Sequence, residues 1–113
     1  MQLAATYKPV RETEIGRIFE LPSETWARRV SGVFSNLKAQ EEPDLAHGLL
    51  TRNPDETIRV NIRAPLNNKK GADILCRAFP TGGGRAAAAG INFLPPEQLE
   101  LFFKTFEEVF GKR

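Results

Sequence analysis

The residues of this chain best suited to chemistry are a run of glycines followed by an arginine, Gly82-Gly83-Gly84-Arg85. Glycines adopt backbone angles that other residues avoid, and they leave no side chain between a ligand and the peptide N–H groups. A turn of this kind can bind an anion such as phosphate, with the Arg85 guanidinium adding a bidentate contact. It is not a Walker phosphate loop, because no Gly-Lys-Ser or Gly-Lys-Thr follows. Taken alone, three glycines more often mark a flexible surface turn before a packed strand.

Basic residues close to this run strengthen the interpretation. Arg59 and Arg63 fall on one face of a predicted strand, and Lys69 and Lys70 lie on the loop that leaves it. If this strand adjoins the glycine turn, these groups converge with Arg85 on one anion. The alternative is an ordinary solvated sheet face, above all for Arg59 and Lys70. The predicted phosphate-binding residues are Arg59, Arg63, Lys69, Gly82, Gly83, Gly84 and Arg85.

The remaining reactive side chains are one histidine and one cysteine. No pattern of carboxylates or thiols supports His47 as a base, so we expect it at the surface or satisfied in the core. Cys76 has apolar neighbours and should be buried and inert, and a lone cysteine, which forms no internal disulfide, fits a reducing cytoplasm. Metal sites draw on several His, Asp, Glu or Cys side chains, so we expect no catalytic metal site and no cofactor in this chain.

The composition is that of an ordinary globular domain. The chain has 113 residues, 41% of them hydrophobic and 27% charged, and 16 basic against 14 acidic residues leave a formal net charge of +2. This length can bury one core without disulfides. Because the net charge is small, anion binding must come from local placement of basic groups. No apolar stretch approaches the roughly 20 residues of a bilayer helix and no signal-peptide core is present, so we expect no membrane partner.

Hydrophobic periodicity predicts the elements that must position these residues. Alternation predicts strands over residues 12–21, 45–52, 57–63 and 91–94, with the second and third joined by a hairpin turn at 53–56. The strand ending at Arg63 should point Ile58, Val60 and Ile62 into the core and its arginines outward. Residues 1–11 show no period and are expected to be a loose leader.

Three helices are predicted between and after these strands. Ser23 can cap a long helix whose apolar stripe includes Trp26, Val33 and Phe34. A short helix should lie between residues 71 and 80, and an aromatic-rich helix from residue 95 to 111. The order of elements predicts an α/β (α+β) domain, with a mixed central sheet of about four to five strands flanked by two long helices and one short one.

The two motifs together resemble a known family. The stretch Ile58-Arg-Val-Asn-Ile-Arg-Ala-Pro65, followed about twenty residues later by Gly82-Gly-Gly-Arg-Ala-Ala-Ala-Ala-Gly90, is similar to the DHH-associated domain, the C-terminal half of many Asp-His-His (DHH) phosphoesterases. Arg63 matches the strand arginine of the family, and Gly82–Gly84 and Ala88-Ala89-Gly90 match its small residues. Arg85 stands where the family usually has histidine. The resemblance covers about residues 45–110.

The resemblance implies a substrate-binding role. In the family, a metal-bearing DHH domain cleaves a phosphodiester or phosphoanhydride, while the DHH-associated domain holds the nucleotide or nucleic acid. Since this chain has no Asp-His-His motif, Mn²⁺ or Mg²⁺ is expected in a catalytic DHH domain of the same parent chain. Residues 1–113 are then a single DHH-associated domain, a C-terminal fragment of a two-domain phosphoesterase. Arg85 stays charged where a histidine would titrate, so it acts only as a charged donor.

The expected function is therefore to bind the phosphates of a nucleotide or short single-stranded nucleic acid for a DHH phosphoesterase, a hydrolase of exonuclease or oligonucleotide phosphodiesterase type. Two alternatives stay open. In the first alternative, the chain is an oligomerisation module, with the aromatic helix as a homodimer seam and the glycine turn as a structural crossover. Or it is the C-terminal domain of an alanyl-tRNA synthetase, which shares the domain type.

Overall fold

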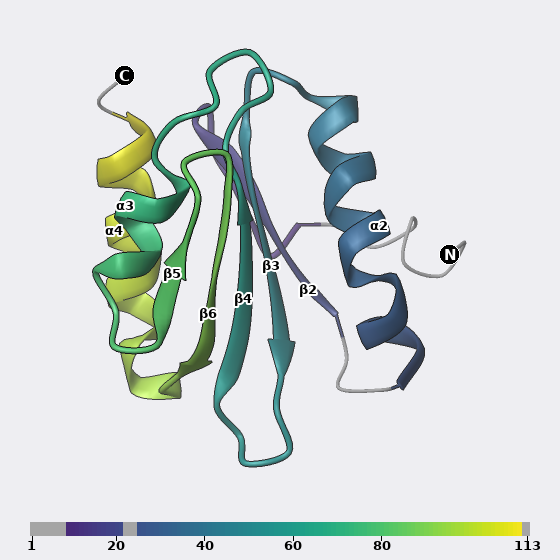
Figure 1. Ribbon diagram of the computed structural model, residues 1–113, viewed down its shortest axis with the longest axis vertical. Helices are drawn as coiled ribbons and strands as arrows, with labels where there is room; N and C mark the ends of the chain where they lie inside the picture. The colour runs from purple at the N-terminus through teal and green to yellow at the C-terminus, as the bar shows by residue number, and fades with distance from the viewer. Residues whose placement is uncertain (1–8, 22–24, 112–113) are drawn as a thin grey trace.

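A six-stranded mixed sheet with helices on both faces forms the centre of the molecule (Figure 1). The computed structural model describes residues 9–21 and 25–111, with side chains of the first helix described from residue 32 onward. The strands are β1 (Arg11–Glu12), β2 (Gly16–Leu21), β3 (Ala46–Arg52), β4 (Ile58–Arg63), β5 (Gly82–Gly84) and β6 (Ala88–Leu94). The helices are α2 (Thr25–Glu41), α3 (Ala72–Arg77) and α4 (Leu99–Gly111), the last preceded by a 3₁₀ turn at Pro96–Gln98. The predicted fold class is confirmed.

The strands run in the order β1-β2-β3-β4-β6-β5. Strands β2 and β3 are parallel, and every other neighbouring pair is antiparallel. Parallel strands need a long crossover, which α2 provides. The predicted hairpin between β3 and β4 is confirmed: the Asn53 amide donates to the Thr57 carbonyl at 2.8 Å, and the Thr57 amide donates to Asp55 Oδ1 at 3.0 Å.

The helices cover the sheet unequally. Helices α3 and α4 pack on one face, where Ile18, Val60 and Ile91 meet Phe102 in the main core. Helix α2 packs on the opposite face over β3, and its Phe34 ring meets Phe19 edge-on with centroids 5.2 Å apart. As a result, residues 46–51 of β3 are buried on both faces, while β4 alternates between buried and at least partly exposed residues. The face on which α2 packs is therefore partly open at β4, which α2 also contacts, and open at β6 and β5.

Two short strands extend the sheet beyond the sequence prediction. Gly82–Gly84 form the edge strand β5, where a turn was predicted, and β6 begins at Ala88, three residues before the predicted start. Arg11 was predicted to belong to the leader and Glu12 to begin the strand 12–21, but both form the separate strand β1 and pair with Ile18 and Arg17. Glycine and alanine carry no hydrophobic alternation, and a two-residue strand is too short to show any. The structure of these segments is therefore set by backbone hydrogen bonds between strands and not by the periodicity of side chains.

The first helix is confirmed in its backbone, and its stripe is corrected in one position. Phe34 is fully buried, whereas Val33, predicted on the same stripe, is 58% exposed. The proposed cap Ser23 and the Trp26 side chain lie outside the described residues, as do residues 1–8 of the predicted leader.

The aromatic stripe of α4 is confirmed as core. Phe102, Phe106 and Phe110 are buried, with neighbouring ring centroids 6.3 and 5.1 Å apart. These rings are therefore unavailable as a dimer seam. Within the described residues, no helix is long and apolar enough to cross a bilayer.

Replacing Phe102 tests the core assignment. The ring is fully buried against Phe79 and Phe106, so Phe102→Ala should lower the free energy of unfolding by about 3–5 kcal/mol, measured by urea titration. The neighbouring Leu101 is 54% exposed, and Leu101→Ala should stay within about 0.5 kcal/mol. Equal losses for the two variants would contradict the packing described.

Candidate phosphate-binding site

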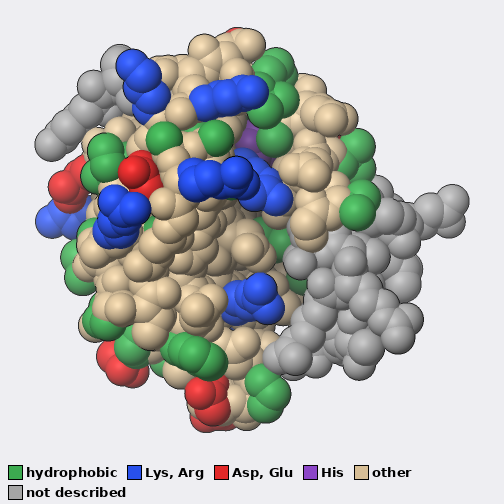
Figure 2. All heavy atoms as spheres, viewed as in Figure 1, with side chains coloured by type: hydrophobic (Ala, Val, Ile, Leu, Met, Phe, Trp, Pro, Cys, Tyr) green, Lys and Arg blue, Asp and Glu red, His purple; other side chains and the backbone are tan. Residues whose placement is uncertain are grey.

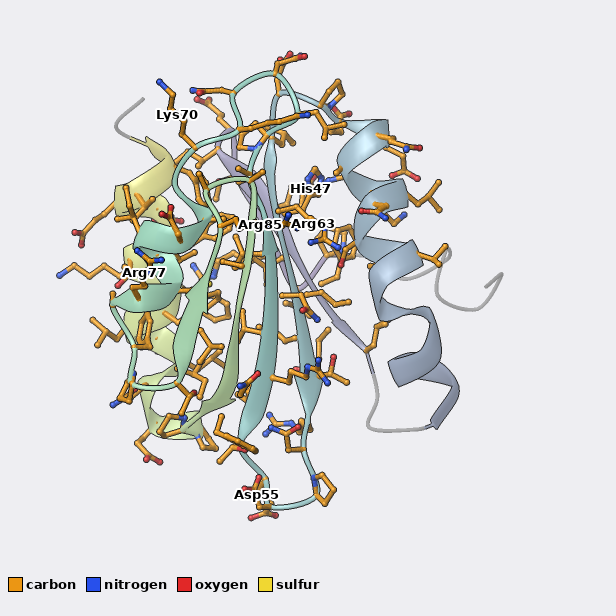
Figure 3. The ribbon with its side chains drawn as sticks, in the orientation of Figure 1. His47, Asp55, Arg63, Lys70, Arg77 and Arg85 are labelled. Carbon is orange, nitrogen blue, oxygen red and sulfur yellow. The ribbon has the colours of Figure 1, made fainter. Side chains whose placement is uncertain are left out.

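Pairing across the sheet places several basic residues in one row. Arg17 pairs with His47, His47 with Arg63, and Arg63 with Ala88. Directly opposed side chains share a face of the sheet, with Cβ atoms about 5 Å apart. The Arg85 amide donates to the Ala88 carbonyl at 2.9 Å, so Arg85 continues the row on the hairpin between β5 and β6. Figure 3 shows Arg63, Arg85 and His47 together at this end of the sheet.

The next row forms an uncharged floor in which two of the three residues are glycines. Asn61 pairs with Gly90, and Gly90 pairs with Gly83. A Cβ on Gly83 would meet nothing within 4 Å, so bare backbone faces solvent there. In Figure 2, Lys and Arg side chains gather over the end of the sheet that carries Arg63 and Arg85, with a tan area of backbone below them. A ligand held by the two arginines can thus approach the peptide chain closely.

Arg63 offers an unused hydrogen-bond donor. The residue is half-buried, and its Nε atom is buried without a hydrogen-bond acceptor in the described part of the chain. Buried polar groups normally have a partner, and a guanidinium forms its strongest hydrogen bonds with anionic oxygens. Arg85 is exposed on the other side of the small Ala88 side chain. The two guanidiniums can therefore contact one anion from both sides of Ala88.

His47 is a neutral spacer between two arginines. Arg17 donates to His47 Nε2 from Nε at 3.1 Å and from Nη2 at 2.9 Å, so Nε2 accepts and the ring proton resides on Nδ1. Burial, and then the charge of Arg17, lower the pKa of His47 from 6.5 to about 4. Of the two places predicted for His47, the surface and the core, the structure shows the core, since the residue is 3% exposed. Its Nδ1 atom is buried without a hydrogen-bond partner in the described part of the chain.

Arg17 is fastened to α2 rather than free for a ligand. Its Nη2 donates to the Lys38 carbonyl at 3.0 Å and forms an ion pair with Glu41 at 3.4 Å. The sequence placed Asn61 on the same strand face as Arg63, but it did not show Arg17 and His47 as neighbours of Arg63. The signal that joins them is the strand register, in particular the parallel pairing of β2 with β3, and single-sequence patterns do not show register.

Two of the three glycines are explained by packing. A Cβ on Gly82 would lie 1.6 Å from the Cys76 carbonyl oxygen, and Gly84 has a φ of 137° and no room for a Cβ against Ala89. The Gly82 amide donates to the Phe79 carbonyl at 3.0 Å. The prediction of a turn with successive free amides is therefore wrong. The amides of Gly82 and Arg85 both donate hydrogen bonds within the fold, and the segment is an edge strand packed against α3. Gly83 remains the glycine with open space above it.

The other predicted residues lie further away. Arg59 is exposed on the same face, four residues from Arg63 and thus about 13 Å along β4. Lys69 and Lys70 are exposed on the loop after β4, and Figure 3 shows Lys70 pointing away from Arg63 and Arg85. Lys70 instead lines a surface cavity of about 310 Å³ beside Ile74 and Val109. The structure thus brings Arg63, Gly83 and Arg85 together, adds Arg59 to the same face, and separates Lys70.

No metal site is assigned to the described residues, which contain no group of three His, Cys, Asp or Glu side chains able to hold an ion. The predicted burial of Cys76 is confirmed. Burial, and then the charge of Asp73, raise the pKa of its thiol to about 12, so the thiol stays protonated at neutral pH.

Among solved structures are proteins similar to this chain. A crystal structure of an exopolyphosphatase-related protein from Bacteroides fragilis matches 86% of the chain with a TM-score of 0.60 and 22% sequence identity. An uncharacterized protein from Helicobacter pylori G27 matches 93% of the chain with a TM-score of 0.46 and 21% identity. The chain spans 28% of the length of each of these proteins. The sequence matches no protein-family model and no curated protein. The similarity to the Bacteroides fragilis structure shows a common fold.

The glycines provide a matched pair of variants. Gly82→Ala forces a methyl group into the α3 backbone and should lower the free energy of unfolding by about 3 kcal/mol or more. Gly83→Ala has open space and should change it by no more than about 0.5 kcal/mol. Urea unfolding measures both. A large loss for Gly83→Ala would mean that the floor is covered.

The pKa of His47 predicts a pH dependence of stability. Because the folded state has a pKa of about 4 and the unfolded state about 6.5, the unfolded state binds more protons between these values. Stability from His47 is therefore fully present above pH 6.5 and is lost as pH falls to about 4, by about 3 kcal/mol in total. His47→Gln should lack this part of the slope in urea titrations from pH 7 to pH 4.

The pKa of His47 can also be measured directly by NMR. The chain has one histidine, so the imidazole signal in NMR belongs to His47 without assignment of the rest. Titration near pH 6.5 in the folded protein would contradict the buried pair with Arg17.

Proposed function

We propose that this chain is the substrate-binding, DHH-associated domain of a DHH-family phosphoesterase, and that it binds the phosphate groups of a nucleotide or short single-stranded nucleic acid. The observation that carries the proposal is the row in which Arg63 and Arg85 stand on either side of Ala88, beside the bare backbone of Gly83 and Gly90.

The chemistry of this row suits a phosphate group. Guanidiniums bind phosphate oxygens through two parallel N–H donors, and this geometry favours an anion that presents two oxygens, such as a phosphate, over a monatomic anion. Arg63 provides a half-buried guanidinium held at the sheet, and Arg85 provides an exposed one. Since neither glycine has a side chain, the ligand can lie against the strand. The chain would contribute position and charge neutralisation to the reaction of its parent.

The fold supports the class of parent protein. The Bacteroides fragilis structure with the same fold is exopolyphosphatase-related, and polyphosphate hydrolysis, like phosphodiester hydrolysis, acts on a phosphorus–oxygen bond. The resemblance of the two motifs to the DHH-associated domain points to the same chemistry. In this proposal Mn²⁺ or Mg²⁺ belongs to the catalytic DHH domain of the parent chain, and the protein works in the cytoplasm, in keeping with its free buried cysteine.

The arginine pair can be tested by binding. Arg63→Ala with Arg85→Ala should weaken binding of a fluorescent pentathymidylate at least ten-fold at 50 mM salt, since each arginine forms a charge-assisted contact. The log affinity of the parent protein should fall linearly with log salt, with a shallower slope in the variant. Fluorescence anisotropy measures both quantities.

The control removes the same charge elsewhere. Lys70→Ala with Lys104→Ala lowers the net charge equally, yet both side chains are exposed and belong to the loop after β4 and to α4. This variant should bind nearly as well as the parent protein. If both double variants lose the same affinity, binding is a response to net charge, and the assigned site is wrong. If neither loses affinity, the proposed function fails.

A further inference from the structure

A β-bulge places two residues of β6 opposite one residue of β4. Ile58 pairs with Leu94 and Val60 pairs with Ile91, so Asn92 and Phe93 together face Arg59. A bulge redirects side chains and is a frequent device next to binding sites. Here it turns an aromatic ring to the same open face that carries the arginine row.

The orientation of Phe93 follows from its neighbours. Leu94 is buried in the core beneath α3 and α4, and adjacent strand residues point to opposite faces, so Phe93 points to the open face. Its side chain is 52% exposed. Among the exposed large apolar side chains of the described residues, Phe93 is the aromatic one.

The backbone around Phe93 is held in place. The Phe93 amide donates to Thr81 Oγ1 at 2.9 Å, and the Asn92 amide donates to the Thr81 carbonyl at 3.3 Å. From the β3–β4 hairpin, Asn53 Nδ2 donates to the Asn92 carbonyl at 2.9 Å. The ring is therefore presented from a fixed position and not from a mobile loop.

The open face thus has two different ends. Arg63 and Arg85 lie at one end, and Phe93 with Arg59 at the other, about 13 Å away along β4. Between them the floor is uncharged, formed by Asn61, Gly90 and Gly83. A polyphosphate chain carries charge along its whole length and has no flat apolar group. A nucleic-acid strand alternates phosphates with bases, and aromatic side chains together with cations are how proteins bind single strands.

We propose that Phe93 is a base-stacking residue and that the ligand of this face is a single-stranded oligonucleotide at least two nucleotides long, not an inorganic polyphosphate. The inference rests on the proposed function, because the Arg63–Arg85 pair binds one phosphate while Phe93 stacks on the base of a neighbouring nucleotide. Arg59, opposite the bulge, lies where it can neutralise a second phosphate.

The test separates bases from phosphates. Pentathymidylate, an abasic pentamer with the same phosphates, and inorganic tripolyphosphate are titrated into the parent protein and its variants. Phe93→Ala should weaken pentathymidylate binding by roughly 5- to 150-fold, the usual loss on removing one stacking partner. Binding of the abasic pentamer and of tripolyphosphate should change less than two-fold. Phe93→Trp, which restores a stacking surface, should bind pentathymidylate at least as tightly as the parent protein.

The outcomes distinguish the two proposals. If Phe93→Ala binds pentathymidylate like the parent protein while Arg63→Ala with Arg85→Ala weakens it, stacking is refuted and the phosphate site stands. Equal losses for pentathymidylate and the abasic pentamer in Phe93→Ala would also refute stacking. Tighter binding of tripolyphosphate than of pentathymidylate by the parent protein overturns the choice of ligand. If the arginine variant binds all three ligands unchanged, the proposed function fails. Urea unfolding of each variant confirms that it is folded.

Discussion

The alternation of strand β4 is the constraint on which the rest of the structure depends. Ile58, Val60 and Ile62 enter the core beneath α3 and α4, which forces Arg59, Asn61 and Arg63 onto the other face. Because α2 packs over β3 and only borders β4, that face is partly open at β4 and open at β6 and β5. Apolar burial therefore holds the polar face in position, and a shift of the register by one residue would exchange the two sets.

Charge is distributed unevenly along the row that crosses the sheet. Arg17 is neutralised by Glu41 and fastened to α2, and His47 stays uncharged between two arginines. Burial disfavours a charged imidazole there and the Arg17 guanidinium would repel it, so the ring stays neutral. The positive charge of this row that is available to a ligand therefore lies on Arg63 and Arg85. The residue between them in the row is Ala88, which has a small side chain.

The glycine run combines two requirements within three residues. Gly82 and Gly84 allow the edge strand to lie against α3 and to turn toward Ala89, so their small size serves the fold. Gly83 has no such neighbour, and its lack of a side chain keeps the floor open beside Gly90. The proposed base-stacking role of Phe93 extends this division, since the bulge frees one ring from the core while Leu94 and Ile91 remain in it.

The sequence by itself determined the elements whose side chains alternate or recur with helical spacing: the β3–β4 hairpin, the core face of β4, the buried stripe of α4, and the fold class. It also led to the expectation that Arg63 and Arg85 converge if the strand adjoins the glycine run. Only the tertiary structure decided that the glycines form an edge strand, that Lys70 points elsewhere, and that Arg17 and His47 join Arg63. The physical reason is that periodicity is a local property of the chain, whereas register, bulges and the face that a helix covers arise from contacts between segments far apart in sequence.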